Sequence, residues 1–143
     1  MAVFRDADHA WGCLGGLFET LARDAAVGPK LREAGFVLRF NYSEPALSIT
    51  VDAVAPAPDP AVHVTVLRGD GGRAAQVELE MSADVAHRFW LGKVNPMMAI
   101  MKREIVAKGP IALVMKLLPI VKPAYEIYPR LLAGRGEGAL AEA

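Results

Sequence analysis

The chain has 143 residues, of which 53% are hydrophobic, and this is enough to build one domain with a substantial core. Its 16 Lys and Arg residues balance its 16 Asp and Glu residues, so no overall field attracts nucleic acid, and we expect no nucleic-acid partner. The single cysteine, Cys13, excludes an internal disulfide, and its apolar neighbours predict a buried thiol.

The first predicted element is a helix that is capped by Asp6 and runs to about Asp24. The charges of this N-terminal region stand where a signal peptide needs an apolar run, which predicts a cytoplasmic protein. The heavy use of Ala, Gly, Pro, Val and Arg is typical of a GC-rich bacterial genome. One apolar stripe recurs at helical spacing along the helix, and consists of Ala7, Ala10, Trp11, Leu14, Leu17, Phe18 and Leu21.

Four strands are predicted next, because apolar and polar residues alternate over 36–42, 47–51, 62–66 and 75–81. Strands with one polar face predict an antiparallel sheet that is open to solvent on one side and covered on the other. The segment 68–73, with the sequence RGDGGR, resembles a phosphate-binding loop, but a strand follows it instead of a helix. We therefore interpret this segment as a hairpin turn.

Helices are predicted in the last third of the chain. Ser82 caps the first of them, Gly92 ends it, and Asn95 caps a short helix that begins with Pro96. Residues 103–109 predict a fifth, short strand. The apolar segment 110–132 is long enough to cross a bilayer, but its charged residues and prolines exclude a membrane span. The expected organisation is one domain over residues 1–133 with a flexible C-terminal tail over 134–143.

No catalytic or metal site can be assembled from the sequence. His9, His63 and His87 lack the spacing of metal ligands, and all three are predicted on solvent-facing sides of their elements. Glu78 and Glu80 share one face of a strand, but it is the polar face, which favours a solvated pair over catalytic carboxylates. We expect no catalytic residue, no metal and no cofactor.

Residues 89–109 combine a Phe-Trp pair and three methionines with a fringe of basic residues. The apolar C-terminal segment adds more hydrophobic surface, although one sheet face and the first helix already supply a core. This surplus predicts a cavity, an oligomer contact or a membrane-facing surface. Methionine is flexible and polarizable, so it suits a pocket that accepts varied apolar shapes.

From Ser82 onward, the chain has an acidic residue that opens a helix, an aromatic turn leading to Gly-Lys, a short apolar helix and a basic strand that ends in glycine. These places are occupied by Asp84, Phe89, Trp90, Gly92, Lys93, Asn95, Pro96, Ala99, Met101, Lys108 and Gly109. This order resembles the sterol carrier protein-2 family. The chain departs from the family pattern at Lys102-Arg103 and at Pro110, which bears on the ligand more than on the fold.

The resemblance implies an α+β fold, in which helices cover one face of a five-stranded, mainly antiparallel sheet. It also implies an apolar tunnel between the sheet and the C-terminal helices that accepts fatty acids, acyl-CoA thioesters or sterols. Lys93, Lys102 and Arg103 are candidates for contact with a polar head group or a membrane. The candidate lining residues are Phe36, Phe40, Phe89, Trp90, Met97, Met101, Leu117, Val121 and Tyr125.

Three functions remain open. The first is a non-catalytic lipid-binding or lipid-transfer protein, with a lipid ligand and transient membrane contact. The second is a small enzyme for a hydrophobic substrate, which needs an acid or base on the apolar face, and Glu104 is the nearest candidate. The third is an accessory subunit whose C-terminal helices bind a partner. A monomer with an empty cavity favours the first function, and a homodimer that buries Leu117, Val121 and Tyr125 favours the third.

Overall fold

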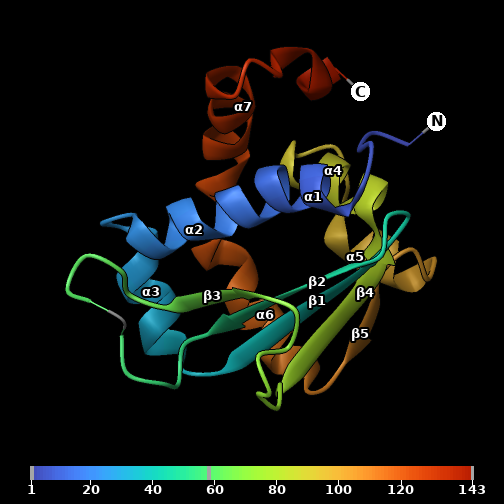
Figure 1. Cartoon of the computed structure of the whole chain (residues 1–143). Helices are drawn as coiled ribbons and strands as arrows, with labels where there is room; N and C mark the ends of the chain where they lie inside the picture. Colours follow the sequence, from blue (N-terminus) through green and yellow to red (C-terminus); the bar gives the residue numbers. More distant parts are fainter. Residues whose placement is uncertain (1, 58, 143) are drawn as a thin grey trace.

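The computed structural model describes residues 2–57 and 59–142, and helices cover one face of its five-stranded sheet (Figure 1). The strands are β1 (Val37–Ser43), β2 (Leu47–Asp52), β3 (Thr65–Arg68), β4 (Val77–Ser82) and β5 (Val106–Lys108), in the order β3-β2-β1-β4-β5. β1 pairs in parallel with β4, and the other three pairings between these strands are antiparallel. The predicted α+β class and the mainly antiparallel sheet are confirmed.

The alternation of β1 separates a dry face of the sheet from a polar one. Phe40 is buried, and it lies opposite Ile49 of β2 and Leu79 of β4 in the strand register. Rows of this kind continue along the sheet and form the floor of the core. On the other face, the Asn41 amide donates a hydrogen bond to the Glu78 carboxylate at 3.0 Å, so Glu78 belongs to a polar surface as predicted.

The loop between β3 and β4 is not a hairpin, which corrects the sequence-based interpretation. β3 lies at one edge of the sheet, whereas β4 lies beyond β2 and β1, and the two strands run in the same direction. Parallel strands need a crossover and cannot be joined by a tight turn. The crossover is tied to the sheet by Arg73, whose guanidinium lies 2.7 Å from the Asp52 carboxylate.

The first helix has the predicted limits, and it consists of α1 (Ala7–Ala10), a π-helical stretch η1 (Trp11–Gly15) and α2 (Gly16–Arg23). The Asp6 side chain accepts a hydrogen bond from the His9 N–H at 2.8 Å and so caps the helix. Gly15 is needed because a Cβ there would lie 2.4 Å from the ring of Trp11, which packs against the helix backbone. Five of the seven residues of the apolar stripe are buried, whereas Ala7 and Trp11 are half-buried.

The remaining helices are α3 (Val27–Ala34), α4 (Ala83–Trp90), α5 (Pro96–Met101), α6 (Ile111–Ile120), α7 (Ala124–Gly134) and the 3₁₀ helix η2 (Gly138–Glu142). The Ser82 and Asn95 side chains cap α4 and α5 as predicted. The apolar segment 110–132 divides into α6 and α7. Among the described residues, no helix is long and apolar enough to cross a membrane.

The C-terminal segment packs against the domain, which differs from the expected flexible tail. The carbonyl oxygen of Leu140 lies 2.7 Å from Nε2 of His87, and the Lys93 ammonium donates to the Ala141 carbonyl at 3.0 Å. His9 and His87 are buried beneath this segment, so their predicted exposure is wrong. Helical periodicity could not reveal the cover, because it comes from residues distant in the chain.

Candidate functional site

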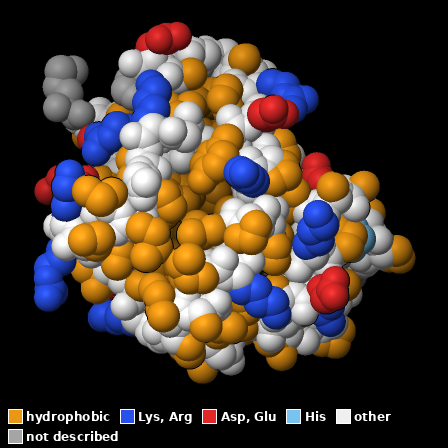
Figure 2. All heavy atoms as spheres, turned by 180° about the vertical axis from the view of Figure 1, so that it is seen from behind, with side chains coloured by type: hydrophobic (Ala, Val, Ile, Leu, Met, Phe, Trp, Pro, Cys, Tyr) orange, Lys and Arg blue, Asp and Glu red, His pale blue; other side chains and the backbone are white. Residues whose placement is uncertain are grey.

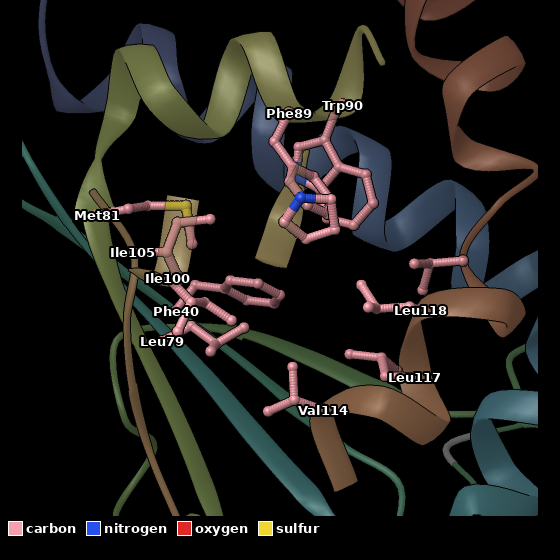
Figure 3. A pocket seen from close by; sticks show the side chains of 12 residues that line it. Phe40, Leu79, Met81, Phe89, Trp90, Ile100, Ile105, Val114, Leu117 and Leu118 are labelled. Carbon is pink, nitrogen blue, oxygen red and sulfur yellow. The ribbon is translucent and has the colours of Figure 1, made fainter. Parts of the chain in front are cut away.

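An apolar cavity of about 40 Å³ lies between the dry face of the sheet and the helices. Figure 3 shows that its lining side chains converge from the strands, from α4 and from α6. None of the lining residues is charged. The full lining is Phe40, Leu79, Met81, Phe89, Trp90, Pro96, Ile100, Ile105, Val114, Leu117, Leu118 and Val121.

Two smaller cavities of about 20 Å³ each continue this space along the sheet. The middle cavity shares Phe40 and Val121 with the main one, and it shares Leu38 and Val51 with the far one, which reaches α3. Leu117 lines all three. The cavities therefore form a row beneath α6, separated only by apolar side chains.

Aromatic rings build the wall between the main cavity and the first helix. Phe18 of α2 stacks on Phe40 with ring centroids 4.7 Å apart, and it meets Trp90 edge to face at 5.6 Å. Phe89 meets Trp90 edge to face at 4.7 Å. Such offset and edge-to-face pairs contribute about 0.5–1.5 kcal/mol each beyond their buried area, so this wall is the rigid side of the site.

The structure places five of the nine predicted lining residues around the main cavity. Phe36 lines the far cavity instead, and the Tyr125 ring lies 6.1 Å from that of Phe89 without lining any of the three cavities. Met97 and Met101 are exposed, because α5 turns Pro96 and Ile100, one helical turn apart, toward the cavity. The five that line it are Phe40, Phe89, Trp90, Leu117 and Val121.

Sequence reasoning missed seven residues of the main lining. Leu79 and Met81 were detectable, because their strand alternation puts them on the same sheet face as Phe40. The missed residues on helix α6 had no pattern that marks the cavity side, since α6 is apolar almost all round. The missed residues are Leu79, Met81, Pro96, Ile100, Ile105, Val114 and Leu118.

The predicted charged residues lie outside the cavity. Lys93 is held by the Ala141 carbonyl, whereas Lys102 and Arg103 are exposed at the end of α5. Arg103 has a φ of 61°, a left-handed conformation that costs a non-glycine residue about 1–2 kcal/mol. Glu104 is exposed and is absent from the cavity lining, and among the described residues no acid or base lines the apolar cavity.

Tyr42 carries a buried hydroxyl that has no hydrogen-bond partner in the part of the chain that the structure describes. Its ring stacks on Phe40 with centroids 5.9 Å apart, and it pairs with Met81 across the strands, so both neighbours line the cavity. Burial raises the pKa of Tyr42 well above its ordinary value, and the hydroxyl stays protonated. An unpartnered buried hydroxyl costs about 1–3 kcal/mol.

A second polar cluster joins the first helix to the C-terminal segment. The ligand atoms of His9, Cys13 and Glu137 lie within 4.8 Å of one another, a spacing compatible with a metal ion. These atoms already bond to protein groups. The Arg5 N–H donates to His9 Nδ1 at 3.1 Å, which leaves the proton on Nε2 to bond the Glu137 carboxylate. Arg135 donates to the same carboxylate at 3.0 Å.

The protonation of this cluster also disfavours a metal. Burial, together with the nearby Glu137 charge, raises the pKa of Cys13, whereas metal binding requires a thiolate. Burial would raise the pKa of Glu137, but the hydrogen bonds from His9 and Arg135 outweigh it and lower that pKa below its ordinary value. We interpret the cluster as a structural contact that fixes the C-terminal segment to the first helix.

These features define a class of small α+β proteins in which helices close an apolar cavity over one face of the sheet. The chain belongs to the SCP-2 sterol transfer family, whose model matches residues 17–122. This confirms the family resemblance found in the sequence. A comparison with curated proteins gives no match.

Solved structures share the fold at low sequence identity. The chain is 20% identical to a sterol carrier protein domain 2 of Helicoverpa armigera, with a TM-score of 0.60 over 79% of this chain and 85% of that one. It is 18% identical to the apo form of sterol carrier protein 2 from Yarrowia lipolytica, with a TM-score of 0.58 and coverage of 92% and 96%. A UbiJ-SCP2 ubiquinone synthesis protein matches at 17% identity, with a TM-score of 0.55 and coverage of 78% and 87%.

Proposed function

We propose that this protein is a non-catalytic cytoplasmic carrier that holds a flexible, single-chain lipid in the row of cavities beneath α6. A fatty acid or a fatty acyl thioester fits this description. The observation that carries the proposal is the row itself, in which three adjoining cavities have linings without a charged side chain. Membership of the SCP-2 sterol transfer family also supports a lipid ligand.

The size of the cavities favours a chain over a rigid ring system. The main cavity holds about 40 Å³, whereas pockets for drug-sized ligands hold roughly 300–1,000 Å³. A ligand must therefore widen the space. A thin chain can enter by rotating side chains such as Leu117, which lines all three cavities. A rigid fused-ring sterol is wider than a single chain and requires a larger displacement of the lining.

Helix α6 is the part of the cavity wall that we expect to move when a ligand enters. No side chain caps its N-terminus, Pro119 lies inside it, and the turn over 121–123 separates it from α7. It packs on the cavities through apolar contacts that re-form around a lipid. Burying a few hundred Å² of lipid at about 25 cal/mol per Å² offers several kcal/mol before the cost of association.

Presentation of the lipid to an enzyme is the second candidate function. It is favoured by the shared fold of the UbiJ-SCP2 ubiquinone synthesis protein. In this role the chain would act as an accessory subunit and hold a lipid while a partner enzyme modifies it.

The proposal is tested by titrating a fluorescent fatty acid into the protein in vesicle-free solution. Leu117→Trp fills the meeting point of the three cavities and should weaken binding by tenfold or more, whereas Ala112→Trp on the exposed side of α6 should not. Competition with unlabelled fatty acid and with cholesterol then ranks the ligands. Equal binding by the two variants, or stronger competition by cholesterol, would contradict the proposal.

A further inference from the structure

Helices α5 and α6 expose large apolar side chains beside the cavity. Met101 is 75% exposed, an unusual state for so apolar a residue, and four other apolar residues of α5 and α6 are also exposed. These are Met97 at 41%, Met98 at 46%, Ile111 at 49% and Met115 at 46%. We call these five residues the α5–α6 face. Figure 2 shows the side of the molecule turned away in Figure 1, where hydrophobic side chains form a broad field.

Basic side chains lie around this apolar field, with some acidic ones among them (Figure 2). Lys102 and Arg103 follow α5 directly, and Lys116 lies on α6 next to Met115. All three are exposed, and none forms an ion pair with another of the described residues. Over residues 97–116 the chain has four Lys or Arg residues and one acidic residue, Glu104, so the segment that forms the face carries net positive charge.

The face continues inward to the cavity on both helices. From α5, Pro96 and Ile100 line the main cavity, while Met97 and Met101 point outward. From α6, Val114 and Leu118 line it, while Ile111 and Met115 point outward. A lipid chain that passes between the two helices would therefore meet apolar groups from the surface to the interior.

We propose that the α5–α6 face docks on an anionic lipid bilayer and that the lipid enters and leaves the tunnel between α5 and α6. This inference rests on the proposed function, because it names the surface and the partner for the same site. The exposed side chains enter the acyl boundary of the bilayer, and Lys102, Arg103 and Lys116 contact lipid phosphates. The ligand then moves between bilayer and tunnel without crossing water.

Charge complementarity favours a bilayer over a second copy of this chain. A two-fold dimer through the α5–α6 face would bring the same cations of both copies together around one apolar contact. An anionic surface neutralises them instead, and each cation near such a surface strengthens binding roughly fivefold. Methionine side chains adapt to the irregular lipid boundary better than branched ones.

The experiment measures flotation of the full chain with phosphatidylcholine vesicles, prepared with and without phosphatidylglycerol. Binding should require the anionic lipid and should fall when salt is raised to about 1 M, where the Debye length is about 3 Å. The Lys102→Ala and Lys116→Ala variants should each weaken binding roughly fivefold. The double variant Met101→Ser, Met115→Ser should weaken it by a similar or larger factor.

Matched controls lie away from the face. Arg23→Ala removes an exposed cation at the end of α2, and Val54→Ser removes an apolar side chain that is 56% exposed after β2. Neither should change flotation. Binding that is independent of phosphatidylglycerol, or that the controls weaken as much as the test variants, would overturn the inference. So would sedimentation as a dimer that the double methionine variant dissociates.

Titration of the fluorescent fatty acid without vesicles separates this inference from the proposed function. The surface variants should bind the probe like the parent chain while losing flotation. Normal probe binding with no flotation of the parent chain overturns the docking inference alone. Loss of probe binding in the parent chain would overturn the proposed function.

Discussion

The imidazole Nδ1 of His87 accepts a hydrogen bond from the Tyr128 hydroxyl at a distance of 2.7 Å. Since Nε2 lies 2.7 Å from the Leu140 carbonyl oxygen, Nε2 carries the single proton of a neutral ring. Protonation would turn Nδ1 into a donor and break the bond from Tyr128 unless the hydroxyl rotated. This buried, neutral histidine links α4, α7 and η2.

Stability should therefore fall in mild acid. Burial lowers the pKa of His87 below its ordinary value of about 6.5. Below that pH the unfolded chain binds a proton at this histidine, whereas the folded chain does not. The free energy of unfolding therefore decreases by up to about 1.4 kcal/mol per pH unit. Urea titrations between pH 7 and about pH 5 should show this slope. It should disappear in His87→Gln and persist in His63→Gln. If the His87→Gln variant kept the same pH dependence of stability, another titrating group would be responsible for it.

Gly109→Ala should be strongly destabilising. Gly109 has a φ of 110°, and a Cβ there would lie 2.2 Å from the carbonyl oxygen of Gln76, a backbone atom that cannot move aside. We expect a loss of roughly 3 kcal/mol or more in the free energy of unfolding. Gly69→Ala is the control, because Gly69 has a φ of 86° with open space around it and should cost only about 1–2 kcal/mol. If urea unfolding gave the same loss of free energy for both variants, the close approach of β5 to β4 would be contradicted.

Tyr42→Phe should stabilise the ligand-free protein. The substitution removes a buried hydroxyl that lacks a partner and keeps the ring stacked on Phe40. We expect the free energy of unfolding to rise by about 1 kcal/mol. Tyr128→Phe removes a hydroxyl that bonds His87 and should instead lower it by about 1–2 kcal/mol. A loss of stability in Tyr42→Phe would mean that a bound water satisfies the hydroxyl.

Arg103→Gly should raise the stability of the protein and weaken its binding to vesicles. Arg103 adopts a left-handed φ of 61°, which glycine tolerates, so the variant should gain about 0.5–1 kcal/mol in stability. It should still lose roughly fivefold in vesicle binding, because one cation of the basic fringe is gone. Lys102→Gly serves as the comparison, since Lys102 has an ordinary φ of −82° and glycine there should lower stability. Thermal unfolding and vesicle flotation of both variants provide the readouts.

Much of the fold was predictable because the signals are local. The β1 alternation predicted the buried face that carries Phe40, and side-chain caps at Asp6, Ser82 and Asn95 marked where helices begin. Five of the twelve residues that line the main cavity were among the predicted lining residues. Leu117 was one of these candidates, and it lines all three cavities.

Strand order, by contrast, depended on tertiary structure. The glycine-rich segment before β4 has the composition of a hairpin turn, yet it belongs to a crossover, because β4 pairs with β1 instead of β3. Alternation identifies the apolar face of each strand, but it does not say which strand lies beside which.

The sequence by itself determined most of the helices and strands, because capping and hydrophobic periodicity act over a few residues. The strand expected at 62–66 is an exception, since β3 spans Thr65–Arg68. The tertiary structure alone decided that Ile100 faces the cavity while Met101 faces outward, and that the C-terminal segment covers His87. Burial is a property of whichever partner covers a side chain. Here the partners come from distant parts of the chain, such as Leu140 for His87, and no local pattern encodes them.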